Sequence, residues 1–137
     1  MKAAKKARRV EERTVVVIVS GDKTLLFRRR DRLLSGMYEP LNLTGVFSAN
    51  AVREAVAALG GNPGKVVALR DAKHLFTHVE WRMKGFLLYS DSFPPPENAV
   101  WAGREALSEE FALPSAFAAY TKDLPLWLMQ GWRTARG

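Results

Sequence analysis

The sequence predicts a single α+β domain, because strand-forming segments dominate up to residue 102 and helix-forming segments follow from residue 104. Its 137 residues are 47% hydrophobic and 26% charged, which is typical of one ordinary globular domain. A chain of this length buries a core without help from disulfides or structural metals. It has no cysteine, which excludes disulfides, cysteine-ligated metals and a cysteine nucleophile. With no long apolar run and no signal segment, we expect a cytoplasmic protein without a membrane contact.

The first two predicted strands are residues 14–20 and 23–29. Residues 14–20 read Thr-Val-Val-Val-Ile-Val-Ser, and this continuous β-branched run predicts a central strand that is covered on both faces. The turn residues Gly21 and Asp22 then predict a hairpin. Residues 30–40 contain Asp, Ser, Gly and Pro, which indicates a long, basic, exposed loop.

The rest of the chain predicts further strands and four helices. Ser48 or Asn50 is a suitable cap for a helix over residues 51–59, and the Gly60-Gly61 pair ends it. Three more helices are expected at 104–111, 114–121 and 124–132, the last packing back on the sheet. The remaining predicted strands are 43–48, 65–70, 86–90 and 99–102, with a strand–turn–strand alternation over 71–84.

Positive charge is concentrated at the start of the chain. The formal net charge is +7, and residues 1–13 hold six basic and two acidic side chains, which is +4 of that total. Such a segment favours a polyanionic partner, with binding that weakens as salt is added. A solvated, frayed terminus is the alternative. We expect residues 1–13 to be a basic linker remnant and residues 14–137 to form the single domain.

Residues 53–61, Arg-Glu-Ala-Val-Ala-Ala-Leu-Gly-Gly, resemble the core of a Nudix box. In Nudix hydrolases this pattern carries two adjacent glutamates, whose oxygens bind the divalent metals that polarise a pyrophosphate. Here Ala57 and Ala58 occupy those positions, and Glu54 alone does not hold a metal cluster. The resemblance implies a Nudix-like α/β/α sandwich with a mixed sheet and a degenerate Nudix helix, with no metal ligand and no catalytic residue.

Residues 74–81, His-Leu-Phe-Thr-His-Val-Glu-Trp, are similar to the signature of the C-terminal domain of MutY-type adenine DNA glycosylases. Three more segments match that family in the same order. They are residues 25–30, residues 33–40 (Leu-Leu-Ser-Gly-Met-Tyr-Glu-Pro), and Trp101 with Leu107 and residues 113–116 (Leu-Pro-Ser-Ala). The loop departs from the family's Trp-Glu-Phe-Pro at residues 38–41, so the resemblance does not define its exact phosphate contacts.

The resemblance implies a DNA-repair module that recognises 8-oxoguanine opposite adenine in duplex DNA. In the family a separate helical domain of the same polypeptide excises the adenine and carries a 4Fe-4S cluster on four cysteines. Because this chain has no cysteine, that domain and cluster lie outside it, and we expect the chain alone to be non-catalytic and without a cofactor. A bacterial, cytoplasmic, nucleoid-associated monomer is expected.

The candidate lesion-reading residues follow from the chemistry of 8-oxoguanine. Oxidation turns guanine N7 into a donor and adds a carbonyl at C8, so the reader needs a group that both accepts and donates. Thr77 takes this role by its match to the family's Ser/Thr, with Phe76 as a wedge or stacking surface and His78 shaping the loop or contacting phosphate. His74 is a weaker candidate. A metal at the two histidines is disfavoured because the segment alternates like a strand, and Trp81 is expected in the core.

A second candidate DNA-binding surface comprises Arg28, Arg29, Arg30, Arg32 and Gly36. Guanidinium groups suit phosphates, and a glycine lets a backbone N–H approach one. The alternative is a solvated run of charge.

Two other functions remain open. One is a stand-alone Nudix-like hydrolase of oxidised nucleotides, with Glu39, Glu54 and Glu80 as metal ligands. The other is a general basic domain that binds nucleic acid or protein without lesion preference.

Overall fold

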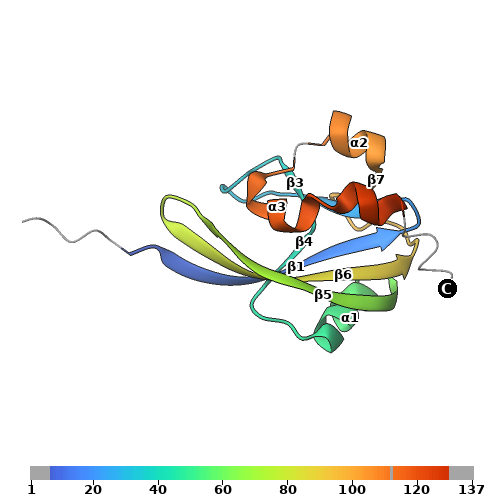
Figure 1. Cartoon of the computed structure of the whole chain (residues 1–137), viewed down its shortest axis with the longest axis horizontal. Coiled ribbons are helices and arrows are strands. Elements are labelled where there is room, and N and C mark those ends of the chain that lie inside the picture. The colour runs from blue at the N-terminus through green and yellow to red at the C-terminus, as the bar shows by residue number, and fades with distance from the viewer. Residues whose placement is uncertain (1–6, 112, 130–137) are drawn as a thin grey trace, which may run out of the picture.

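The computed structural model describes residues 7–111 and 113–129, which form a mixed sheet with helices on both faces (Figure 1). The elements are β1 (Arg9–Ser20), β2 (Lys23–Arg28), β3 (Tyr38–Glu39), β4 (Leu41–Thr44), α1 (Ala49–Ala58), β5 (Asn62–Leu75), β6 (Val79–Asp91), β7 (Ala99–Gly103), α2 (Arg104–Glu109), the 3-10 helix η1 (Ser115–Phe117) and α3 (Ala118–Thr121). Residues 124–129 are also helical. The predicted α+β sandwich is confirmed.

The sheet runs in the order β3-β2-β1-β6-β5, with β4 also paired to β1 and β7 to β2. β1 and β6 are parallel, and every other pairing is antiparallel, so the sheet is mixed as predicted. β5 and β6 form one long hairpin from residue 62 to residue 91. The predicted strands at 65–70 and 86–90 are therefore parts of two continuous strands.

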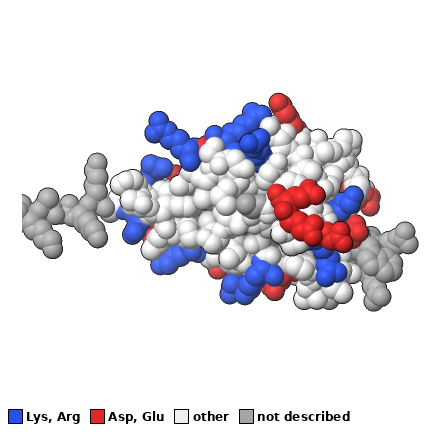
Figure 2. Space-filling model, turned by 90° about the horizontal axis from the view of Figure 1, so that it is seen from above, with Lys and Arg blue, Asp and Glu red and all other residues white. Residues whose placement is uncertain are grey.

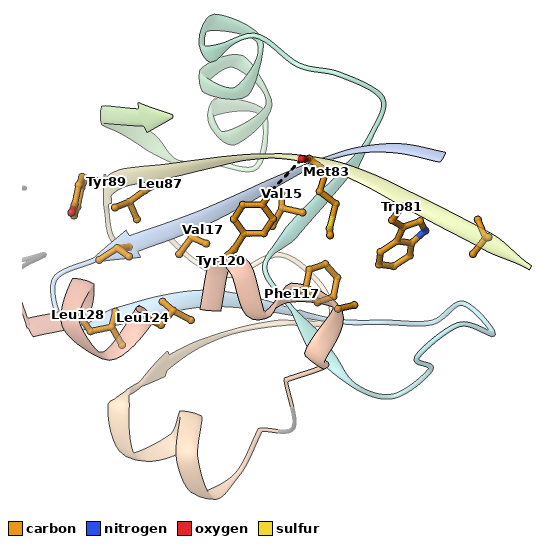
Figure 3. Packing of buried hydrophobic residues seen from close by; sticks show 13 residues of the cluster. Val15, Val17, Trp81, Met83, Leu87, Tyr89, Phe117, Tyr120, Leu124 and Leu128 are labelled. Carbon is orange, nitrogen blue, oxygen red and sulfur yellow. Dashed lines mark hydrogen bonds between the residues drawn. The ribbon is translucent and has the colours of Figure 1, made fainter. Parts of the chain in front are cut away.

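The central strand β1 is covered on both faces, as its apolar run predicted. Val15, Val17 and Val19 join the core beneath η1, α3 and residues 124–129, where Leu124 and Leu128 are also buried (Figure 3). Val16 and Ile18 point to the other face and pack with α1. Leu124 and Leu128 confirm that the last helix packs back on the sheet, although Leu126 and Met129 on its outer side are exposed.

Several element boundaries differ from the sequence prediction. β1 begins at Arg9, five residues before the predicted start at residue 14, because residues 9–13 pair in parallel with residues 79–83 of β6. Part of the segment expected to be a linker is therefore sheet. β4 ends at Thr44, before Gly45 turns the chain at φ +101°, so the predicted strand at 43–48 is wrong from residue 45 onward.

The helix predicted at 51–59 is α1, which spans Ala49–Ala58, whereas two of the later helices are shorter or divided. Ser48 caps α1 by accepting from the Ala51 amide at 3.2 Å, as expected. α2 ends at Glu109, and the predicted helix at 114–121 is split into η1 and α3, with Pro114 just before them. The end of the predicted helix at 130–132 lies outside the described residues.

Tyr120 ties the helical layer to the sheet. Its ring is fully buried, and its hydroxyl donates to the backbone carbonyl of Arg70 at 2.9 Å. The same hydroxyl also donates to the Met83 carbonyl at 3.2 Å (Figure 3). Burial raises the pKa of Tyr120 to about 12. The phenol therefore stays neutral in the folded protein to higher pH than in the unfolded chain.

This pKa predicts how Tyr120→Phe changes the pH dependence of stability. Above the ordinary tyrosine pKa of about 10, the unfolded chain loses a proton that the folded protein keeps, so the contribution of Tyr120 to stability falls as pH rises toward 12. Phenylalanine removes this dependence together with the hydrogen bond. In urea unfolding from about pH 9 to 12, the stability difference between wild type and variant should shrink. A difference that is constant over this range would contradict the assignment.

Candidate functional site

The segment predicted to read the lesion forms the turn of the β5–β6 hairpin. The Phe76 amide donates to the Val79 carbonyl at 2.8 Å, which closes the turn around Thr77 and His78. The side chains of Thr77 and His78 are exposed, and Phe76 is half-buried. The structure therefore presents a hydroxyl and an imidazole at the tip of a hairpin, where an external ligand has access to both.

The start of β1 lies beside this turn. The Arg9 amide donates to the His78 carbonyl at 3.1 Å, and Arg8 Nε donates to the Phe76 carbonyl at 2.6 Å. Ala7, Arg9, Thr77 and His78 line an open cavity of about 330 Å³. Sequence reasoning missed Arg8 and Arg9 as members of the site, because their segment was assigned to a linker; their positive charge was the available signal.

A chain of aromatic rings runs from the turn into the core. His74 meets Phe76 edge to face at 4.7 Å between ring centroids, and Phe76 meets Trp81 in the same way at 4.8 Å. Trp81 is 1% exposed and lies 5.7 Å from Phe117, which confirms it as a core residue. The Phe76 ring is therefore packed against the core rather than free in solvent.

Arg29 is buried, so its prediction as a member of the second candidate DNA-binding surface is wrong. Its side chain is 4% exposed and donates to the Leu33 carbonyl at 2.9 Å, to Asp31 at 3.0 Å and to Glu39 at 2.8 Å. Burial raises the pKa of Glu39, although hydrogen bonds from Arg29 and Asn42 act in the opposite direction. All the Arg29 nitrogens are thus engaged within the protein, so this side chain holds the loop in shape.

The other members of the predicted basic surface are exposed. Arg28 and Arg30 line a cleft of about 280 Å³ together with Ser35, Gly36 and Asn98, and Arg32 lies on the same loop. Gly36 has φ +81°, which explains the glycine, but its amide donates to the Arg29 carbonyl at 2.9 Å. The amide is therefore not free for a phosphate, contrary to what we expected of Gly36.

The hairpin turn and the basic loop meet at Trp81. Phe76 of the turn lies against one part of the indole, and the Arg29 guanidinium carbon lies 5.0 Å from its ring centroid. Figure 2 shows an acidic patch on one half of the molecule and basic side chains over much of the remaining outline, some of them beside the acidic patch. Glu105, Glu109 and Glu110, in and after α2, line an acidic cleft. At the turn, the charged lining of the cavity comes from Arg9, beside Thr77 and His78, which favours an anionic ligand there.

The residues present do not fit a Nudix metal centre. Glu54, Ala57 and Ala58 lie exposed on α1. Glu39 is bonded to Arg29 and Asn42, and Glu80 is bonded to Arg82 at 2.7 Å, which lowers the pKa of Glu80. Among the described residues, no three His, Asp or Glu side chains gather where they could hold a metal ion. The structure therefore does not bring the three proposed glutamate ligands together.

The mixed sheet between α1 and the C-terminal helices defines an α/β/α sandwich whose Nudix-box helix lacks the metal-binding glutamates. The profile of the NUDIX domain matches residues 14–123, so the chain belongs to the NUDIX domain family. A search of curated proteins found no match. Within the described residues, no helix is long and apolar enough to cross a membrane.

Three solved structures illustrate the similarity of fold. The C-terminal domain of mouse MUTYH, in a complex with human PCNA, gives a TM-score of 0.63 at 19% identity, covering 91% of this chain and 90% of that chain. A MutT NUDIX hydrolase from Burkholderia pseudomallei gives 0.64 at 16% identity, covering 82% and 96%. The E. coli ORF135 protein gives 0.52 at 18% identity, covering 95% and 93%. At these identities the likeness establishes the fold alone.

Proposed function

We propose that this NUDIX domain recognises 8-oxoguanine opposite adenine in duplex DNA, as the lesion-reading module of an A/G-specific adenine DNA glycosylase. The observation that carries the proposal is the exposed hydroxyl of Thr77 at the hairpin tip, in a cavity that Arg9 and His78 also line. A hydroxyl accepts from N7–H and donates to the C8 carbonyl of the lesion. Arg8, Arg9, Arg28, Arg30 and Arg32 supply the phosphate contacts. The catalytic domain and its iron–sulfur cluster belong to the part of the polypeptide outside this chain.

Two features favour a binding module over the hydrolase. First, Ala57 and Ala58 occupy the helix positions where a hydrolase has its metal-binding glutamates. Second, the other candidate ligands are already hydrogen-bonded to arginines, Glu39 to Arg29 and Glu80 to Arg82. The similarity to the mouse MUTYH C-terminal domain extends over nine-tenths of both chains, and the similarity to the MutT hydrolase is as high by TM-score. The choice between a binding module and a hydrolase therefore depends on which metal-binding side chains are present, and not on the fold.

The test compares two duplexes of the same sequence, one with 8-oxoguanine opposite adenine and one undamaged. We expect tighter binding of the damaged duplex and larger NMR shifts for residues 74–78. Equal affinities and equal shifts with the two duplexes would mean that the domain binds DNA without any preference for the lesion. Magnesium-dependent turnover of 8-oxo-dGTP that Glu54→Gln abolishes would establish the hydrolase instead.

Thr77→Val is expected to remove about 1 kcal/mol of the preference for the damaged duplex, which is the usual net value of one neutral hydrogen bond. Valine keeps the shape and the β-branch of threonine and lacks only the hydroxyl. Thr77→Ser is the matched control, because it keeps the hydroxyl and should retain the preference. Binding of the undamaged duplex should not change in either variant. If valine and wild type discriminate equally in fluorescence anisotropy titrations, Thr77 does not read the lesion.

A further inference from the structure

Trp81 occupies the junction between the hairpin turn and the basic loop. It comes from β6, is 1% exposed, and points toward Phe117 in the core (Figure 3). The edge of Phe76 packs on it with 4.8 Å between centroids. The guanidinium carbons of Arg13 and Arg29 lie 5.2 Å and 5.0 Å from its ring centroid. A single buried ring therefore contacts Phe76, beside the hairpin turn, and Arg29, at the base of the basic loop.

Packing rather than hydrogen bonding fixes the indole. Its Nε1–H is buried and has no hydrogen-bond partner among the described residues. The orientation of the ring therefore depends on its neighbours, and Arg29 is one of them. The three hydrogen bonds from Arg29 to Leu33, Asp31 and Glu39 hold the guanidinium in one place over the ring.

We propose that Trp81 and Arg29 are positioning residues: the Arg29 guanidinium sets the orientation of the Trp81 indole, which in turn sets the Phe76 ring and the turn that presents Thr77. This inference rests on the proposed function, since the turn it positions is the proposed lesion reader. Close-packed side chains pass on a displacement because they have no free space to absorb it. The stack also holds the basic loop and the turn at a constant separation, so both surfaces engage one duplex together.

The test is Arg29→Lys, which keeps the positive charge beside Glu39 but removes the planar group that stacks on the indole. Because the nitrogens of Arg29 are engaged within the protein, we expect little change, within about twofold, in the affinity for undamaged duplex. The preference for damaged duplex should fall about threefold to tenfold, because an ammonium group keeps the charge near the ring but cannot stack flat on the indole as the guanidinium does. Equal weakening on both duplexes would mean that Arg29 contacts phosphate directly, and would overturn the proposal.

Two controls separate positioning from general destabilisation. Val56→Ala removes buried volume from the core on the α1 face of the sheet, away from Trp81, and should lower stability without changing the preference. Arg30→Ala removes an exposed guanidinium and should lower the affinity for the damaged and the undamaged duplex by the same factor. If Val56→Ala reduces the preference as much as Arg29→Lys does at matched loss of stability, the effect is global and the proposal fails.

A measurement without DNA distinguishes failure of this inference from failure of the proposed function. In the free protein, Arg29→Lys should shift the NMR signals of the Phe76 ring and the Thr77 methyl group. Within the described part of the chain, the side chain of Arg29 bonds to Leu33, Asp31 and Glu39 and lies on Trp81, so such shifts would have to pass through the indole. Val56→Ala should leave both signals in place. Trp81→Phe provides a second variant and should move the same two signals. Shifts confined to residues 28–39 and Trp81 would refute the coupling, whatever the protein binds.

Discussion

Glu39→Gln is expected to lower the free energy of unfolding by about 3–5 kcal/mol, because it leaves a buried guanidinium without its charge partner. The Arg29 and Glu39 side chains are 4% and 11% exposed, and their charged atoms are 2.8 Å apart. Glutamine keeps the shape of the glutamate but not its charge, and arginine cannot lose its proton to compensate. Asp31 also accepts from Arg29, but its side chain is 69% exposed, so solvent weakens that contact. Urea denaturation at neutral pH measures the loss.

Arg29→Met removes the other member of the pair, and the free energy of unfolding that it loses should depend on pH. Without Arg29, burial raises the pKa of Glu39 further above its usual range. The folded variant then takes up a proton that the unfolded chain releases, so its stability falls as pH rises above the ordinary glutamate pKa of about 4.3. The variant should therefore be less destabilised near that pH than at neutral pH. The double variant should lose less stability than the two single losses added together. Two small, additive losses would show that the pair is not a buried charged unit.

The parts of the fold that the sequence predicted correctly have strong local signals. The apolar run of β1 indicated a strand covered on both faces, and Ser48 and the Gly60-Gly61 pair marked the two ends of α1. The first half of β1 lacked such a signal. Residues 9–13 are mostly charged and become a strand because the β6 backbone offers them a parallel partner, joined at Arg13 by β4. This is a tertiary effect that local propensity does not contain.

The candidate site was predicted only in part, for a similar reason. The turn residues 76–78 stand at a hairpin tip, as the alternation around them indicated. Arg29 and Arg30 look equivalent in sequence, yet one is buried against Trp81 and the other exposed. Both residues follow the end of β2, and the path of the loop there turns Arg29 inward onto Leu33, Asp31 and Glu39, which local sequence does not indicate. Arg9 joins the site because β1 extends beyond its apolar run.

Gly85→Ala is expected to destabilise the protein by about 3 kcal/mol or more, which is at the upper end of the cost of overpacking a core. A Cβ at this position of β6 would overlap Cε1 of Tyr120 and lie 2.7 Å from its Cδ1. The ring cannot retreat without losing the contacts of its hydroxyl with the Arg70 and Met83 carbonyls. The methyl group therefore separates α3 from the sheet. Thermal and urea unfolding report the loss.

The matched control is Gly103→Ala in β7, where the nearest atom to an added Cβ is the Asp22 carbonyl oxygen at an ordinary 3.8 Å. This variant should change stability by no more than about 0.5 kcal/mol. A smaller side chain at Tyr120 tests the cause directly, because Tyr120→Leu should cost less in the Gly85→Ala background than in wild type. If the two losses simply add, the methyl group does not meet the ring. Gly85 would then matter for the strand itself and not for the packing of the helical layer.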